Sequence, residues 1–104
     1  MAKVDEKWFK DRGWRVIENV QNFGVCGDCE RRSVVCNRLN GGSNARWEHV
    51  YEVYPGGGRT GKTGRSNFYT FYAQGKGYTV KTTTSHRKYE EEDILTALKL
   101  VGLE

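Results

Sequence analysis

Five segments typical of β-strands follow one another along this chain of 104 residues, and two of their four connections are short and rich in glycine or asparagine. Each segment is rich in β-branched and aromatic residues or alternates apolar and polar positions, as strands do. The five segments are 14–21, 33–39, 46–54, 67–73 and 78–84. Parallel neighbours need a crossover of a dozen or more residues, usually a helix, and no such helix lies between these segments. The sequence therefore predicts an antiparallel sheet of about five strands.

Two segments have the periodicity of helices. Residues 89–101 place Ile94, Ala97, Leu98 and Val101 on one apolar stripe, with acidic residues in the first turn and Gly102 positioned to end the helix. Residues 4–11 predict one or two further helical turns, ended by Gly13. We therefore predict a single small α+β domain, residues 1–104, with the C-terminal helix packed on one face of the sheet and a short N-terminal helix.

The charge is uneven along the chain. The net charge is +4, but residues 31–88 carry eleven basic and two acidic side chains. A segment this basic is a candidate surface for anionic partners, although solvated charge spread over several faces would give the same count. The chain has no apolar run of 18 residues, no apolar stretch near Met1 and an odd number of cysteines. These features favour a cytoplasmic protein without a membrane partner.

The stretch 55–66, PGGGRTGKTGRS, matches the phosphate-loop pattern of nucleotide-binding proteins. That loop works between a buried strand and a helix, whose N-terminus contributes to phosphate binding. The residues that follow Thr63 here, GRSNFYTFYA, favour a strand instead. We therefore expect no bound nucleotide.

A long hairpin loop between two strands is the better interpretation of residues 55–66. Its cations Arg59, Lys62 and Arg65 can donate hydrogen bonds to phosphate oxygens, and its glycines allow the backbone to approach a ligand closely. Nucleic-acid binding and a simple solvated loop both remain open at this stage.

The strand NFYTFYA, residues 67–73, is aromatic on both faces. Alternation places Phe68 and Tyr72 on one face and Tyr69 and Phe71 on the other, and we expect Phe71 to belong to the core. Tyr69, Tyr72 and Tyr78 are candidates for stacking on bases, and Lys76 and Lys81 lie close to them in sequence. The same mixture of rings and cations also suits a protein interface.

Cysteines form the second group of candidate site residues. Cys26 and Cys29 have the two-residue spacing of paired zinc ligands, and Cys36 and His49 could complete a tetrahedral zinc site. Alternatively, Cys36 is a small core residue and His49 a buried, hydrogen-bonded one.

Three classes of function follow from these patterns. The first is a small module that binds RNA or DNA, single-stranded or duplex, through the loop 55–66 and the aromatic hairpin 67–84. The second is a regulator or inhibitor that binds a larger enzyme through the same basic and aromatic surface. The third is a metal-dependent nuclease that uses Glu48 and Glu52, although an ion pair with a cross-strand residue such as Arg38 explains these carboxylates equally well. We expect a binding protein rather than an enzyme.

Overall fold

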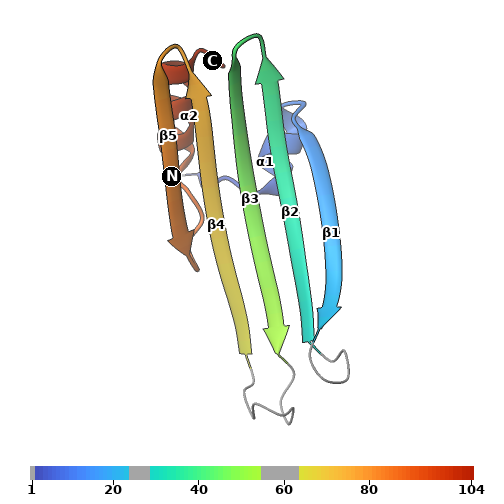
Figure 1. Ribbon diagram of the computed structural model, residues 1–104. Coiled ribbons are helices and arrows are strands. Elements are labelled where there is room, and N and C mark those ends of the chain that lie inside the picture. The colour runs from blue at the N-terminus through green and yellow to red at the C-terminus, as the bar shows by residue number, and fades with distance from the viewer. Residues whose placement is uncertain (1, 24–28, 55–63) are drawn as a thin grey trace.

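The computed structural model describes residues 2–23, 29–54 and 64–104. Its elements are α1 (Glu6–Asp11), β1 (Arg15–Phe23), β2 (Cys29–Asn40), β3 (Ser43–Tyr54), β4 (Gly64–Gly75), β5 (Tyr78–Ser85) and α2 (Glu91–Val101). The five strands form one antiparallel sheet in the order in which they occur along the chain (Figure 1). The predicted α+β fold, with five antiparallel strands and two helices, is confirmed.

Two tight turns connect strands at one end of the sheet. The turn between β2 and β3 has Gly41 at φ 62°, and the turn between β4 and β5 has Lys76 at φ 51° and Gly77 at φ 82°. Positive φ at the first or at both central residues matches the twist of paired strands, which is why glycine is found in two-residue hairpin loops. These turns hold β2 against β3 and β4 against β5.

The second strand is longer than the sequence predicts. It begins at Cys29 instead of Ser33, and β1 continues to Phe23, so that Phe23 lies opposite Cys29. The polar residues at the start of β2, Glu30, Arg31 and Arg32, lack the hydrophobic alternation by which strands are recognised. They lie where the helices do not cover the sheet, and backbone pairing alone makes them part of it.

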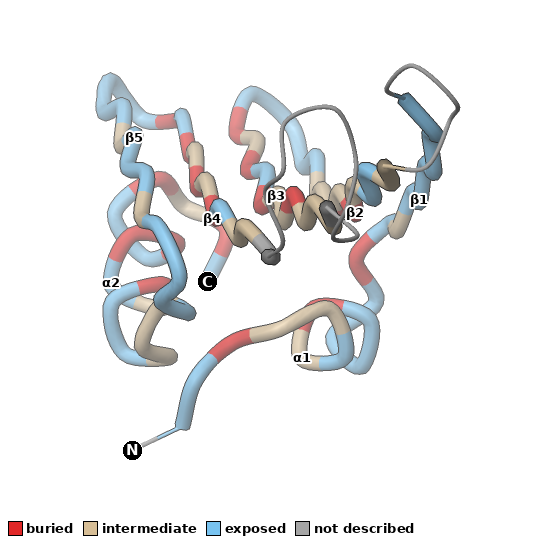
Figure 2. The backbone as a smooth tube through the Cα atoms, turned by 90° about the horizontal axis from the view of Figure 1, so that it is seen from below, coloured by how far each residue is buried: buried red, intermediate tan, exposed pale blue. Residues whose placement is uncertain are grey.

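Both helices lie on the same face of the sheet, which we call the inner face (Figure 2). Alternation along the strands turns Cys36, Trp47 and Phe71 toward this face, where each is at most 1% exposed. The apolar stripe of α2 packs on β3, β4 and β5 and supplies Ile94, Ala97, Leu98 and Val101, all buried as predicted, whereas α1 covers β1 and β2. The prediction that the C-terminal helix packs on one face of the sheet, and that Phe71 belongs to the core, is thereby confirmed.

The C-terminal end of α2 is fixed to the sheet by a close contact. Ser43 Oγ on β3 donates a hydrogen bond of 2.6 Å to the carbonyl oxygen of Val101. Gly75 on β4 lies beside this bond, and a Cβ atom there would come within 2.4 Å of both oxygen atoms. Gly102 then ends the helix with φ 88°, as its position in the sequence predicts.

The helices cover only the part of the sheet near the two tight turns (Figure 1). The other end projects beyond them, and the molecule measures 49 × 26 × 25 Å. In the described ranges, neither helix is long and apolar enough to cross a membrane. In the described part of the chain, no helix covers the opposite face of the sheet or the projecting end of the face on which the helices lie.

Candidate nucleic-acid interface

The face of the sheet opposite the helices, which we call the outer face, is turned toward the viewer in Figure 1. Residues that lie directly opposite each other on neighbouring antiparallel strands point to the same face. The register of the sheet therefore sorts the outer side chains into rows that cross the strands.

One row holds most of the positive charge of this face. It contains one residue from each strand, namely Arg15, Asn37, Arg46, Tyr72 and Lys81. We call it the basic row. With strands about 4.8 Å apart, it spans about 19 Å across the sheet. Its three cations are exposed, and Asn37 and Tyr72 are half-buried.

The cations of the basic row have few acidic partners. Arg46 forms a loose ion pair with Glu48, two positions along the same strand, with 3.5 Å between Nη2 and Oε2. Within the part of the chain that the structure describes, Arg15 and Lys81 form no ion pair. The three cations alternate with Asn37 and Tyr72, about 10 Å from one to the next, and a row of like charges of this kind attracts anions.

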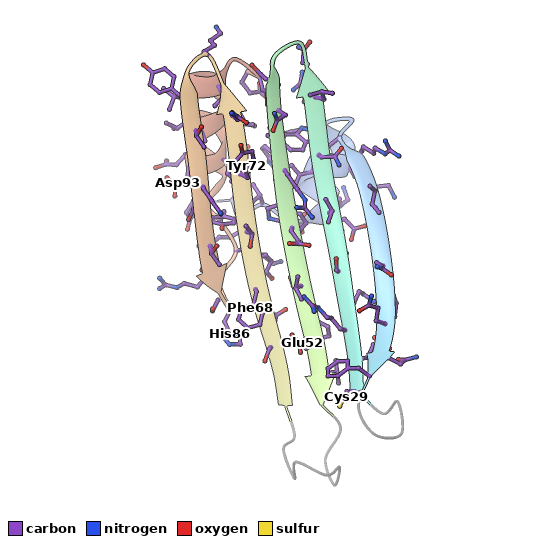
Figure 3. The ribbon with its side chains drawn as sticks, in the orientation of Figure 1. Cys29, Glu52, Phe68, Tyr72, His86 and Asp93 are labelled. Carbon is purple, nitrogen blue, oxygen red and sulfur yellow. The ribbon has the colours of Figure 1, made fainter. Side chains whose placement is uncertain are left out.

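Two aromatic rings lie on the outer face of β4 (Figure 3). Tyr72 lies between Arg46 and Lys81, and its hydroxyl donates a hydrogen bond of 2.6 Å to Gln74 Oε1. Phe68 lies four residues away along the strand, about 13 Å, and is 40% exposed although it is fully apolar. A half-buried ring between two cations and an exposed ring on the same strand are elements from which single-stranded nucleic-acid surfaces are built. Alternation predicted this shared face, and the structure confirms it.

Tyr69 points the other way. It lies on the inner face at 6% exposure, and its ring stacks on that of His49 with centroids 4.4 Å apart and planes 6° apart. Burial raises the pKa of its hydroxyl, with a smaller contribution from Asp5. One ring face is occupied and little of the side chain reaches solvent, so Tyr69 cannot serve as a base-stacking platform in this conformation.

Lys76 and Tyr78 lie at the turn between β4 and β5, away from the basic row. Tyr78 is 53% exposed. The side chain of Lys76 lies over Gly102, where a Cβ atom would come within 2.6 Å of Cε. Its ammonium group is therefore near the C-terminal end of α2, where a cation interacts favourably with the helix dipole. This placement gives Lys76 a structural role that does not depend on a ligand.

Arg59 and Lys62 lie outside the described residues, as does the phosphate-loop pattern up to Thr63. Arg65 belongs to β4, with its backbone opposite Val53, and its side chain is likewise not described. The strand that follows the pattern is antiparallel to β3 and adjacent to it. The helix that a phosphate loop requires is therefore replaced by a strand, as the sequence predicts.

Of the four predicted zinc ligands, the structure describes Cys29, Cys36 and His49, and it does not bring these three together. Cys26 lies outside the described residues. Cys29 and Cys36 are seven residues apart on β2, about 23 Å, and an odd spacing in a strand places them on opposite faces. In the described residues, no three His, Cys, Asp or Glu side chains form a group that could hold a metal.

Cys36 is a core residue, which is one of its two predicted roles, and His49 is hydrogen-bonded but only half-buried. Cys36 is fully buried, and burial, followed by the charge of Glu6, raises the pKa of its thiol to about 11. His49 Nε2 is 2.8 Å from Asn67 Oδ1, in addition to the stacking on Tyr69. A protonated core thiol and a hydrogen-bonded, stacked histidine are both explained by packing.

Glu48 and Glu52 share the outer face, as predicted, but they are not adjacent there. Val50 lies between them on the same face, and they are four residues apart along β3, about 13 Å. Arg38 is not the partner of Glu48, because it lies opposite Ala45 on the inner face, and Arg46 takes that place. The arrangement offers no pair of carboxylates for one metal ion.

A hollow on the inner face, of about 320 Å³, lies beside α1. Its walls include Glu6, Glu18, Arg32, His49 and Tyr51. Arg32 Nε is 3.7 Å from Glu18 Oε1, so the cation there is already paired. Two carboxylates beside one paired arginine disfavour a phosphate at this place.

Comparisons with protein-family models, with curated proteins and with solved structures each gave no match for this chain. Its function must therefore be argued from its own residues.

Arg15, Asn37, Arg46 and Phe68 are not among the binding residues that the sequence predicts. Each is unremarkable in its own segment, and the row appears only when the register aligns all five strands. One signal in the sequence is the alternation of β3, which places Arg46 and Trp47 on different faces of the sheet.

Proposed function

We propose that this chain is a small binding module for single-stranded nucleic acid, and that the strand lies across the outer face of the sheet. The observation that carries the proposal is the basic row, in which three exposed cations and Tyr72 are aligned over all five strands. Arg and Lys contact phosphates irrespective of base sequence, and such contacts supply most of the affinity of a non-specific binder.

Exposed rings favour a single strand over a duplex. Tyr72 and Phe68 can stack only on bases that are not already stacked within a double helix. A wide sheet with rings on its surface is also a poor match for a groove, which admits a helix or a two-stranded ribbon. The proposal therefore includes RNA and DNA, in single-stranded form.

The loop residues extend this surface in the proposal. β3 and β4 carry the two ends of the segment 55–63 at the projecting end of the sheet. We retain Arg59, Lys62 and Arg65 as additional phosphate contacts. Catalysis is not part of the proposal, because Val50 separates the two carboxylates on which a nuclease would depend.

Fluorescence anisotropy across a salt series tests the proposal. Labelled RNA and DNA single strands of about 12 nucleotides, within the range of known site sizes, are compared with duplex DNA. We expect the wild type to prefer single strands. For Arg46→Ala/Lys81→Ala, the slope of log affinity against log salt should become shallower by about 1.4, the value for two lost phosphate contacts on a single strand.

The matched control is Lys10→Ala/Lys99→Ala, which removes the same charge from exposed positions on the two helices. Its salt slope should stay close to that of the wild type. Equal changes in both double variants would mean that only net charge matters, and the proposed surface would be wrong. A third variant, Arg59→Ala/Lys62→Ala/Arg65→Ala, measures the contribution of the loop in the same way.

A protein partner is the competing function, and one observation favours it. Among the described strands, β1 lies at one edge of the sheet, and it exposes Ile17 and Val20, each at 45%. An unpaired, partly apolar edge can accept a strand from another chain. If no nucleic acid binds at low salt, this edge becomes the surface to test, by a 1:1 complex that nuclease treatment leaves intact.

A further inference from the structure

A second feature of the outer face is a polar hollow between β1 and β2, of about 260 Å³. Its described lining residues are Asn19, Gln21, Arg31 and Ser33. Asn19 lies opposite Ser33, and Gln21 lies opposite Arg31, so the four side chains occupy two adjacent rows of the sheet. Opposite residues are about 5 Å apart and the rows about 7 Å. We call this group the amide hollow.

The amide hollow carries unused hydrogen-bonding groups. Each amide offers both a donor and an acceptor, the Ser33 hydroxyl does the same, and Arg31 supplies a fork of donors. Within the described part of the chain, none of the four side chains forms a hydrogen bond or an ion pair. The group is therefore equipped to bind a ligand with a mixed donor and acceptor edge.

The charges around the amide hollow favour a different ligand from the phosphates proposed for the basic row. Arg31 lies opposite Glu52 on β3, so that one cation and one carboxylate accompany two neutral amides. A phosphate gains little where a carboxylate lies opposite the described cation, whereas the edge of a nucleobase is neutral and presents donors and acceptors side by side. Amide side chains are well suited to such edges, and Arg pairs with guanine through two parallel hydrogen bonds.

The position of the hollow fits a strand that is already bound to the outer face. Asn19, Ser33, Val50 and Phe68 belong to one row, with Phe68 on the second strand beyond Ser33, about 10 Å away. A base stacked on Phe68 would place a nearby base of the same strand above the hollow. The basic row runs parallel to this row, two rows nearer to the tight turns.

We propose that the amide hollow binds the edge of one nucleobase and gives the protein a base preference. This inference rests on the proposed function, because it requires a nucleic acid on the outer face. In this division, the basic row determines how tightly a strand binds, and the amide hollow determines which strand binds best.

The test compares four single-stranded oligonucleotides of about 12 nucleotides, oligo-A, oligo-C, oligo-U and a G-rich alternating G/U strand, by anisotropy at one salt concentration. The wild type should prefer one of them about tenfold or more, the discrimination that one paired base contact provides. Asn19→Ala/Gln21→Ala should bring all four affinities to within about threefold, with an unchanged salt slope.

Two controls separate this result from a general loss of binding. Asn22→Ala/Asn44→Ala removes two amides that do not line the hollow, Asn22 from the opposite face of β1 and Asn44 from β3, and should keep the preference. Arg46→Ala/Lys81→Ala should weaken all four complexes by a similar factor and also keep it. Circular dichroism of each variant verifies that the sheet is intact.

Each outcome separates the inference from the proposed function. If the wild type binds all four oligonucleotides equally, the amide hollow does not select a base, and the proposed binding function is unaffected. A preference that survives in Asn19→Ala/Gln21→Ala overturns it as well. A wild type that binds none of the strands at low salt overturns both proposals, and a preference lost only in the Asn19/Gln21 variant supports the inference.

Discussion

The two faces of this sheet are built from alternate residues of the same strands, yet they differ in almost every property. On β3, Trp47 is 1% exposed beneath the helices, and its neighbour Arg46 stands on the outer face with a half-exposed side chain. On β4, Phe71 and Tyr72 show the same contrast. The inner face is buried where the helices cover it, whereas the outer face carries charged and aromatic side chains that no described helix covers. A face of that kind is free to serve a partner.

The largest difference between the faces should appear in stability. Phe71→Ala removes a buried ring and should lower the free energy of unfolding by about 3–5 kcal/mol. Tyr72→Ala, one position along, should lower it by less than about 1 kcal/mol, because surface changes are small. Urea denaturation followed by circular dichroism measures both. Equal losses would show that the outer ring is part of the core.

Gly75 offers a sharper test of the inner face. Gly75→Ala places a Cβ atom within 2.4 Å of Ser43 Oγ and the Val101 carbonyl oxygen. We expect a loss of about 1–3 kcal/mol from overpacking and from the broken hydrogen bond. Gly42→Ala is the control, since a Cβ atom at that position meets nothing within 4 Å. Similar melting of the two variants in a thermal scan would show that α2 is not fixed at this point.

Substitutions of Tyr72 and Tyr69 should distinguish the two faces by their effects on nucleic-acid binding. Tyr72→Ala should weaken single-strand binding by about 1–3 kcal/mol, the value for one stacked base, and Tyr72→Phe should restore most of it. Tyr69→Phe keeps the ring that stacks on His49 and should leave the affinity unchanged. Anisotropy at constant salt measures all three. A strong effect of Tyr69→Phe would place the ligand on the inner face.

The smallest expected effect concerns Cys36. Its pKa of about 11 in the fold exceeds the ordinary value of 9.0, so the unfolded chain loses this proton first as the pH rises. Its contribution to stability is therefore complete below pH 9 and decreases between pH 9 and 11. Cys36→Ala should flatten that decrease in urea titrations. In the folded wild type near pH 8, Cys36 should also resist a thiol reagent that modifies the more accessible Cys29.

Local sequence signals predicted the elements, because strand alternation, turn glycines and the stripe of α2 all depend on nearby residues. Alternation even placed Phe68 with Tyr72 and Glu48 with Glu52. Alternation does not say which face the helices cover. The sequence therefore predicts Tyr69 as a stacking residue, whereas in the structure its ring stacks on His49. That choice depends on contacts between distant segments.

The register of the strands explains the remaining differences between the site predicted from the sequence and the site in the structure. The basic row and the amide hollow exist because particular residues of different strands lie opposite each other, and no single segment reveals that alignment. The separation of Cys29 from Cys36 follows from the early start of β2, whose polar first residues resemble a loop. In each case the missing information was pairing between strands, which local patterns do not contain.

The most direct test of the central claim is a map of the bound surface by NMR. Amide and side-chain signals of the protein are followed while a single-stranded oligonucleotide is added. We predict the largest shifts at Arg46, Tyr72 and Lys81 on the outer face, with small shifts in α1 and α2. Shifts concentrated at Arg32, Tyr51 and Asn67 on the inner face, or on the helices, would contradict the account.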